Sequence, residues 1–138
     1  MTSSIMKPEI RSASLVALAV LLHSGLTGAQ PARPDATQFP AAAVRFLEAE
    51  LPQMEAAIAA RDRDFFEESM ARTVSFSEDW GFKARANPDL APYAACTDAV
   101  SDYVVVGLCR LMPASSTCDP TLASRFDASV RTCRTAAR

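Results

Sequence analysis

Residues 96–133 read CTDAVSDYVVVGLCRLMPASSTCDPTLASRFDASVRTC, and this stretch contains all four cysteines of the chain. Its apolar spacing predicts one helix that starts near Pro92 and ends before Pro113. A second helix is expected to follow, with Asp119 as its N-cap and Pro120 in the first helical position. Because the connection between the two helices is short, an antiparallel helical hairpin is expected.

Four cysteines allow three disulfide pairings, and the distances expected in the hairpin favour one of them. Cys96 and Cys109 lie 13 residues apart on one helix, which places them about 20 Å apart, whereas a disulfide needs Cα atoms within about 7 Å. In the hairpin, Cys109 lies beside Cys118 at the turn, and Cys96 lies beside Cys133 at the open end. We therefore predict the disulfides Cys96–Cys133 and Cys109–Cys118, with the crossed pairing as the alternative. The cysteine spacings lack the close ligand pairs of zinc sites, so no metal site is expected.

The first 29 residues have the order of a secretory signal peptide. Lys7 and Arg11 precede an apolar run at 12–22, SASLVALAVLL, and small residues follow up to Ala29. The run is short for a hydrocarbon layer of about 30 Å. We predict cleavage near Ala29, a periplasmic or secreted location, and no stable membrane insertion of the mature chain. An uncleaved membrane anchor is the alternative.

The remaining chain is expected to be a flexible leader at 30–38 followed by one disulfide-stabilised helical domain at 39–138. Five apolar side chains repeat at spacings of three and four residues and so predict a helix, Val44, Leu47, Leu51, Met54 and Ile58. Pro52 lies inside this run, where it either kinks the helix or begins a new one.

A further helix is predicted from Asp64, which fits an N-cap with the acidic Glu67 three residues later, and a single longer helix through both segments is the alternative. Its apolar side chains are Phe65, Phe66, Met70 and Val74. Residues 75–91 are the least regular part, because they contain Gly81, Asn87 and Pro88. The predicted fold class is all-α, a small bundle of four to five short helices with a disulfide-clamped C-terminal hairpin.

Several function classes are disfavoured by composition. The net charge of -2 becomes -3 once Lys7, Arg11 and Glu9 are removed, and Lys83 is then the one remaining lysine, so no nucleic-acid partner is expected. The single histidine, His23, lies in the predicted signal, which removes histidine-dependent triads and histidine metal sites from the mature chain. With two glycines after residue 29, no glycine-rich phosphate loop can form, and no cofactor is expected.

One candidate binding site combines aromatic side chains with a cation. Phe76, Trp80 and Phe82 lie close in sequence to Arg85, and aromatic residues with an arginine are typical of protein-binding hot spots. The alternative is that the three rings fill the open side of the helical bundle.

The leading functional hypothesis is a non-catalytic binding protein that recognises another protein, as inhibitors, immunity proteins and accessory proteins do. One alternative is a carrier of a small apolar ligand, in a cavity between helices lined by Met54, Phe65, Phe66, Met70 and Met112. A second is an enzyme that uses Asp98 and Asp102, which lie four residues apart on one helix face. The enzyme hypothesis requires both carboxylates in a cleft, with a raised pKa in one of them.

Overall fold

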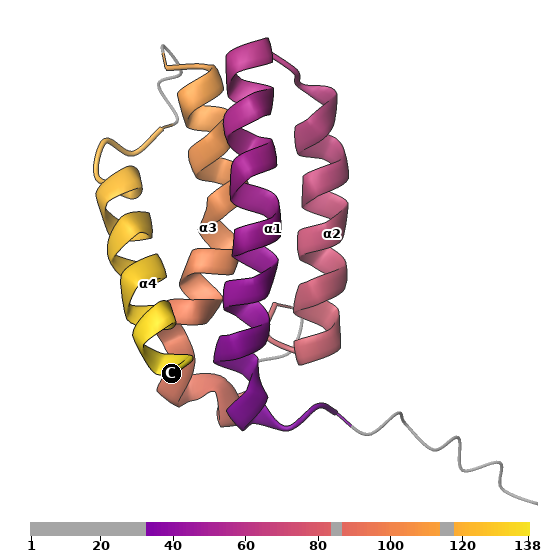
Figure 1. Ribbon diagram of the computed structural model, residues 1–138, viewed down its shortest axis with the longest axis vertical. Helices are drawn as coiled ribbons and strands as arrows, with labels where there is room; N and C mark the ends of the chain where they lie inside the picture. The colour runs from indigo at the N-terminus through magenta and orange to yellow at the C-terminus, as the bar shows by residue number, and fades with distance from the viewer. Residues whose placement is uncertain (1–32, 84–86, 114–117) are drawn as a thin grey trace, which may run out of the picture. The chain divides into compact units, whose positions relative to one another are not determined.

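The computed structural model describes residues 33–83, 87–113 and 118–138. Within these ranges the chain is helical and contains no strand, which confirms the predicted all-α bundle. The helices lie side by side (Figure 1). Their bounds are η1 Ala36–Gln38, α1 Phe39–Ala60, α2 Asp64–Trp80, η2 Pro88–Tyr93, α3 Ala94–Leu111 and α4 Leu122–Ala136, where η marks a short 3-10 helix. The predicted signal at 1–29 and Arg85 lie outside the described residues.

Helix α1 continues through Pro52 as one helix of 22 residues. Pro52 is exposed, and so is Glu48, whose carbonyl would otherwise accept the missing N–H. Because water can reach this side of the helix, the lost hydrogen bond costs less here than in a buried segment. Of the two alternatives for Pro52, the start of a new helix is therefore wrong.

The turn between α1 and α2 shows that the predicted N-cap at Asp64 is wrong. Arg61 adopts a left-handed conformation with φ of 57°, and the backbone N–H of Asp62 donates to the carbonyl of Ala57 at 2.9 Å. The Asp62 carboxylate then accepts hydrogen bonds from the backbone N–H groups of Asp64 and Phe65, at 3.0 and 3.3 Å. The capping carboxylate thus comes two residues earlier than expected, because the chain has already turned at Arg61.

Helix α2 extends through residues that the sequence pattern assigns to an irregular segment. It ends at Trp80, and Gly81 closes it with φ of 73°. Ser77 donates its side-chain hydroxyl to the carbonyl of Val74 at 2.8 Å. Thr73 does the same to the carbonyl of Ser69. Since these hydroxyls find partners within the helix, residues that favour turns are accommodated in it.

The predicted C-terminal hairpin is present, and its two disulfides are Cys96–Cys133 and Cys109–Cys118. Their Cα atoms lie 4.7 and 5.7 Å apart. Helix α4 begins at Leu122 rather than directly after Asp119. The Asp119 carboxylate instead accepts from the backbone N–H of Thr121 at 2.8 Å, which shapes the turn before the helix.

Helices α1, α2 and α3 approach one another closely at Gly107. Gly107 in α3 faces Phe66 of α2 and Met54 of α1, and a Cβ atom added at Gly107 would lie 2.7 Å from the Met54 sulfur. Both facing side chains are buried. Glycine is needed at this position because the helices approach too closely for a larger residue.

Candidate functional site

The aromatic residues singled out from the sequence come together around Phe39 of α1. The ring centres of Phe76, Trp80 and Phe82 lie 6.2, 5.1 and 5.6 Å from that of Phe39. Trp80 is buried, whereas Phe76 and Phe82 are half-buried against the core. This packing favours the alternative in which the rings fill the open side of the bundle.

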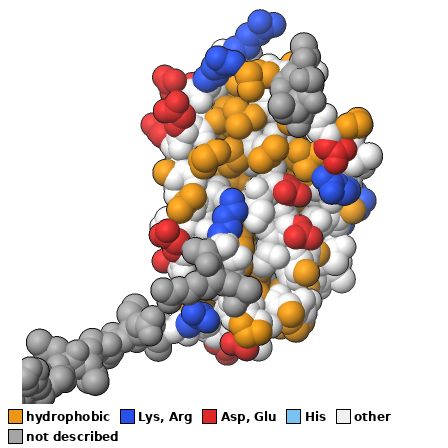
Figure 2. Space-filling model, turned by 180° about the vertical axis from the view of Figure 1, so that it is seen from behind, with side chains coloured by type: hydrophobic (Ala, Val, Ile, Leu, Met, Phe, Trp, Pro, Cys, Tyr) orange, Lys and Arg blue, Asp and Glu red, His pale blue; other side chains and the backbone are white. Residues whose placement is uncertain are grey.

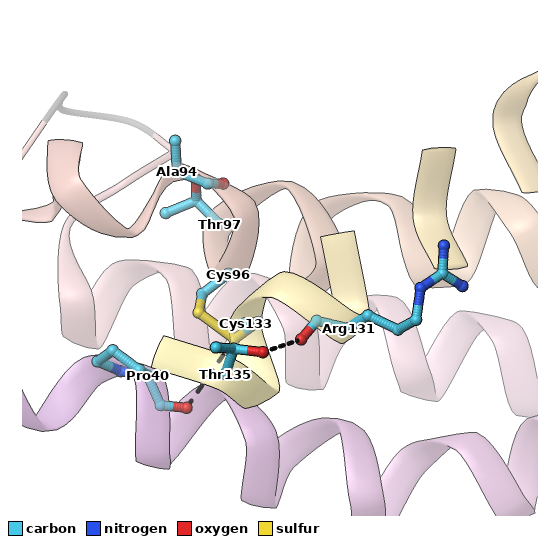
Figure 3. Close-up of a disulfide and its surroundings, with 7 residues drawn as sticks. All are labelled: Pro40, Ala94, Cys96, Thr97, Arg131, Cys133 and Thr135. Atoms are coloured by element: carbon cyan, nitrogen blue, oxygen red, sulfur yellow. Dashed lines mark hydrogen bonds between the residues drawn. A yellow bond between two sulfur atoms is a disulfide. The ribbon is translucent and has the colours of Figure 1, made fainter. Parts of the chain in front are cut away.

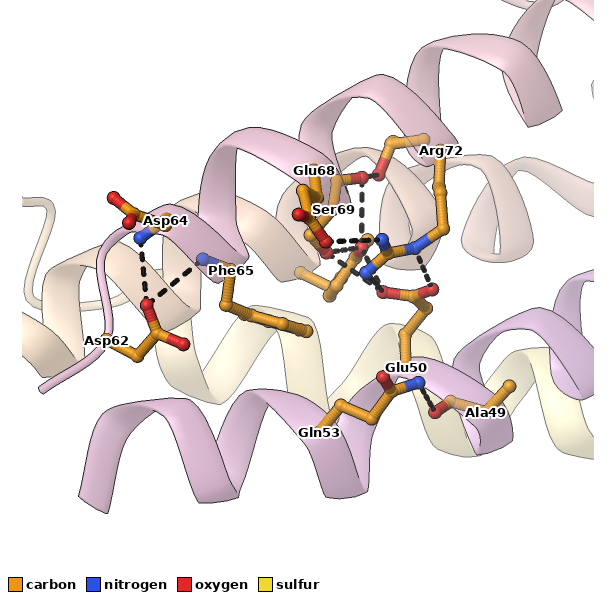
Figure 4. A network of polar contacts seen from close by, with 11 residues as sticks. Ala49, Glu50, Gln53, Asp62, Asp64, Phe65, Glu68, Ser69 and Arg72 are labelled. Carbon is orange, nitrogen blue, oxygen red and sulfur yellow. Dashed lines mark hydrogen bonds and ion pairs between the residues drawn. The ribbon is translucent and has the colours of Figure 1, made fainter. Parts of the chain in front are cut away.

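A buried polar cluster, which no pattern in the sequence indicates, joins α1, α2 and α3 (Figure 4). Its centre is Glu50, whose carboxylate accepts hydrogen bonds from the hydroxyls of Ser69 and Tyr103, each at 2.9 Å. Arg72 donates to the same carboxylate from Nε at 2.6 Å and from Nη2 at 3.0 Å. Ser69 and Tyr103 also contact each other through their hydroxyls. We call Glu50, Ser69, Arg72 and Tyr103 the Glu50 cluster.

The Glu50 cluster keeps its carboxylate ionised. Burial raises the pKa of Glu50, but the hydrogen bonds from Arg72, Tyr103 and Ser69 outweigh burial and hold the pKa below its ordinary value. Burial also raises the pKa of Tyr103, so its hydroxyl remains a donor. A carboxylate saturated with donors is a poor general base, and Ser69 is fully buried. The arrangement is therefore that of a structural tie between helices.

The two carboxylates of the enzyme hypothesis line an open hollow between α3 and α4. Asp98 is exposed and Asp102 is half-buried, and the other lining residues are Arg125, Ala128 and Ser129 of α4. Burial raises the pKa of Asp102, and the charge of Asp98 adds to this effect, whereas Arg125 and Lys83 oppose it. Asp102 thus has the raised pKa that the enzyme hypothesis requires, and Asp98 is the more exposed of the two carboxylates that line this hollow.

Three large apolar side chains of the described residues are exposed, and all belong to α2 or α3. The exposed fractions are 49% for Met70, 41% for Val74 and 46% for Val105. Met70 and Val74 are four residues apart and so share one side of α2. Val105 lies two residues from buried Tyr103, about 200° around α3. Hydrophobic side chains are spread across the upper part of the face seen in Figure 2, with acidic and basic side chains between and around them. We call Met70, Val74 and Val105 the α2–α3 apolar residues.

The chain matches no known protein family, no curated protein and no solved structure. Among the described residues, no three or more His, Cys, Asp or Glu side chains are grouped so that they could hold a metal ion. None of the helices in the described ranges is long and apolar enough to cross a membrane.

Proposed function

We propose that the protein is a non-catalytic binding protein that recognises another protein outside the cytoplasm, in the periplasm or the surrounding medium. The observation that carries the proposal is the exposure of the α2–α3 apolar residues on two helices that bury other side chains in the core. Large apolar side chains held on a rigid scaffold bind a partner with little loss of conformational freedom.

The proposed location is supported by the predicted signal at 1–29 and by the two disulfides. Disulfides persist in oxidising compartments and are rare in the cytosol. Mass analysis of the natively processed protein tests this part of the proposal. We expect an N-terminus at Gln30 and four oxidised cysteines in the extracytoplasmic fraction, whereas an intact residue 1–29 segment would contradict it.

The packing at Gly107 makes a ligand carrier the weaker proposal. A carrier needs space between α1, α2 and α3, where Met54 and Phe66 already lie against Gly107. Met70, which the carrier hypothesis places in the cavity wall, is about half exposed at the surface. Apolar side chains that face outward are suited to a partner's surface rather than to an enclosed small molecule.

The test of the binding proposal is affinity capture from the native extracytoplasmic fraction, with the mature protein as bait and the captured partner then purified. Val105→Glu and Met70→Glu place a charge in the α2–α3 apolar residues at exposed positions, so the bundle should still form. Ser75→Glu is the matched control, because Ser75 is exposed on α2 about 180° from the buried Phe66.

We expect each of the two glutamate variants to weaken binding of the purified partner by at least about tenfold, as loss of a central apolar contact does. Ser75→Glu should bind like the wild type. Equal affinities for all four proteins would contradict the assignment of this surface. The proposed function itself would be contradicted if no captured protein, once purified, bound the wild-type protein.

A further inference from the structure

The two disulfides differ sharply in their access to solvent. Cys96 and Cys133 are fully buried, and the Cys133 sulfur lies 4.0 Å from the backbone oxygen of Pro40 in α1 (Figure 3). Cys109 and Cys118 are half-buried at the other end of the hairpin. Thiol–disulfide exchange requires a thiolate to reach one of the two sulfurs. Cys109–Cys118 is therefore the more accessible of the two disulfides to an external thiol.

The two disulfides also differ in what they hold together. Cys96–Cys133 joins positions 37 residues apart and ties the open end of the α3–α4 hairpin. Cys109–Cys118 joins positions nine residues apart and closes only the connection between these helices. Helix α4 also packs through buried side chains that take no part in either disulfide: Leu122, Phe126 and Val130. Opening Cys109–Cys118 should consequently be a local event that leaves helix packing in place.

We infer that Cys109–Cys118 is a redox-sensitive strap, which a dithiol opens while Cys96–Cys133 stays oxidised and the bundle stays folded. One thiolate of the dithiol attacks a sulfur of the strap, and the Cys109–Cys118 bond breaks as a mixed disulfide forms. The second thiol of the reagent then attacks the mixed disulfide. Two electrons and two protons pass to the protein, which gains two thiols, and the reagent leaves as its own disulfide.

The strap controls the end of α3 that lies next to the α1–α2 turn. Leu108 and Leu111 are half-buried against the core just before and after Cys109. Met112 is the C-cap of α3, and its sulfur lies 2.7 Å from Nη2 of Arg63, which directly precedes α2. Opening the strap removes the covalent restraint on this contact. Residues 108–112 should then exchange their backbone amide hydrogens faster, whereas those around Cys96 should not.

The experiment is a titration of the folded protein with dithiothreitol, followed by alkylation and tryptic mapping. Trypsin cuts after Arg110, Arg125, Arg131 and Arg134, which places Cys118 on residues 111–125 and Cys133 on residues 132–134. Labelling of these two peptides therefore reports the two disulfides separately. Far-ultraviolet circular dichroism, recorded on the same samples, reports whether the helices persist.

We expect the Cys118 peptide to be labelled at a dithiothreitol concentration at least about tenfold lower than the Cys133 peptide. The helical signal should be unchanged at the lower concentration. Simultaneous labelling of both peptides, earlier labelling of Cys133, or loss of helix with the first labelling would overturn the inference. So would resistance of the strap up to the concentration that unfolds the protein.

Two double variants provide an independent measurement. Cys109→Ser with Cys118→Ser represents the open strap and should keep the wild-type helical signal, with faster amide exchange confined to residues 108–112. Cys96→Ser with Cys133→Ser removes the buried clamp and should lose stability throughout the bundle. Loss of folding in the first variant would overturn the inference, because the strap would then be needed for the fold itself.

Discussion

The Oε1 atom of Glu50 lies 2.6 Å from Nε of Arg72, and this pair joins α1 to α2. The side chain of Glu50 is 6% exposed, whereas that of Arg72 is 39% exposed. Arg72 therefore brings its charge to the carboxylate from the surface, and its guanidinium remains partly hydrated. Glu50 is buried and Arg72 is not, so loss of either partner should change the free energy of unfolding by a different amount. Loss of Arg72 is costly because it leaves the buried carboxylate without its cation.

Arg72→Met should lower the free energy of unfolding by about 2–3 kcal/mol, because it leaves the Glu50 carboxylate buried without its charged partner. This is below the cost of breaking a fully buried ion pair, since Arg72 is partly solvated. Urea unfolding measures the change. Glu50→Gln combined with Arg72→Met should recover part of the loss, because the pair is then removed on both sides.

The matched control is Arg110, which pairs with Glu55 across α3 and α1 and has an Nη2–Oε2 distance of 2.6 Å. Both side chains of this pair are substantially exposed. Arg110→Met should cost no more than about 1 kcal/mol, as exposed ion pairs do. If both arginine variants lowered the free energy of unfolding equally, the burial of Glu50 would not explain the cost of Arg72→Met.

Acid should weaken the fold through Glu50. Its pKa in the folded protein lies below the ordinary value of 4.5, since its hydrogen-bond donors outweigh the effect of burial. Its contribution is therefore fully present above that ordinary value and is lost as the pH falls through the lower folded pKa. Glu50→Gln should show a shallower decline of unfolding free energy in urea titrations over this acid range. A decline in the variant as steep as in the wild type would show that other groups cause the loss of stability in acid.

The burial of Glu50 could not be predicted from the apolar pattern of α1. Glu50 lies three residues after Leu47 and four before Met54, in the middle of the buried side of α1. The predicted apolar side included Val44, Leu51 and Ile58, which are only partly buried. A glutamate at a core position normally indicates a break in the apolar pattern, and only the partners on α2 and α3, distant in sequence, make its burial favourable.

Helix α2 shows the same limit of apolar periodicity. Its buried side contains the hydroxyl residues Ser69, Thr73 and Ser77 between Phe66 and Trp80, at spacings of three and four. The predicted apolar side used Met70 and Val74, which are exposed. The hairpin and its cysteine pairs were predictable because chain length limits which sulfurs can meet. The Glu50 cluster was not, since it depends on how three helices approach one another.

Gly107→Ala should lower the free energy of unfolding by about 1–3 kcal/mol, although alanine is the better helix former. The added methyl group would contact the Phe66 ring and lie 2.7 Å from the Met54 sulfur, so side chains of α1 and α2 must shift. Thermal unfolding measures the change. Adding Met54→Ala should make the Gly107→Ala step less costly than it is in the wild type, because space is then available. A stabilised Gly107→Ala variant would show that the contact at Gly107 is looser than described.

Asp102 should have the opposite pH dependence to Glu50. Burial and the charge of Asp98 raise its pKa in the folded protein above the ordinary 3.8, so its ionised form destabilises the fold. That cost is present above the folded pKa and disappears as the pH falls below the ordinary value. Asp102→Asn should therefore raise the free energy of unfolding at neutral pH by a few tenths of a kcal/mol, an effect kept small by partial exposure and by Arg125 and Lys83.

At about pH 3 the stabilities of the variant and the wild type should converge, because the carboxyl is then protonated in both folded and unfolded chains. Urea unfolding at the two pH values measures both effects, and a variant less stable than the wild type at neutral pH would mean that the ionised carboxylate supports the fold.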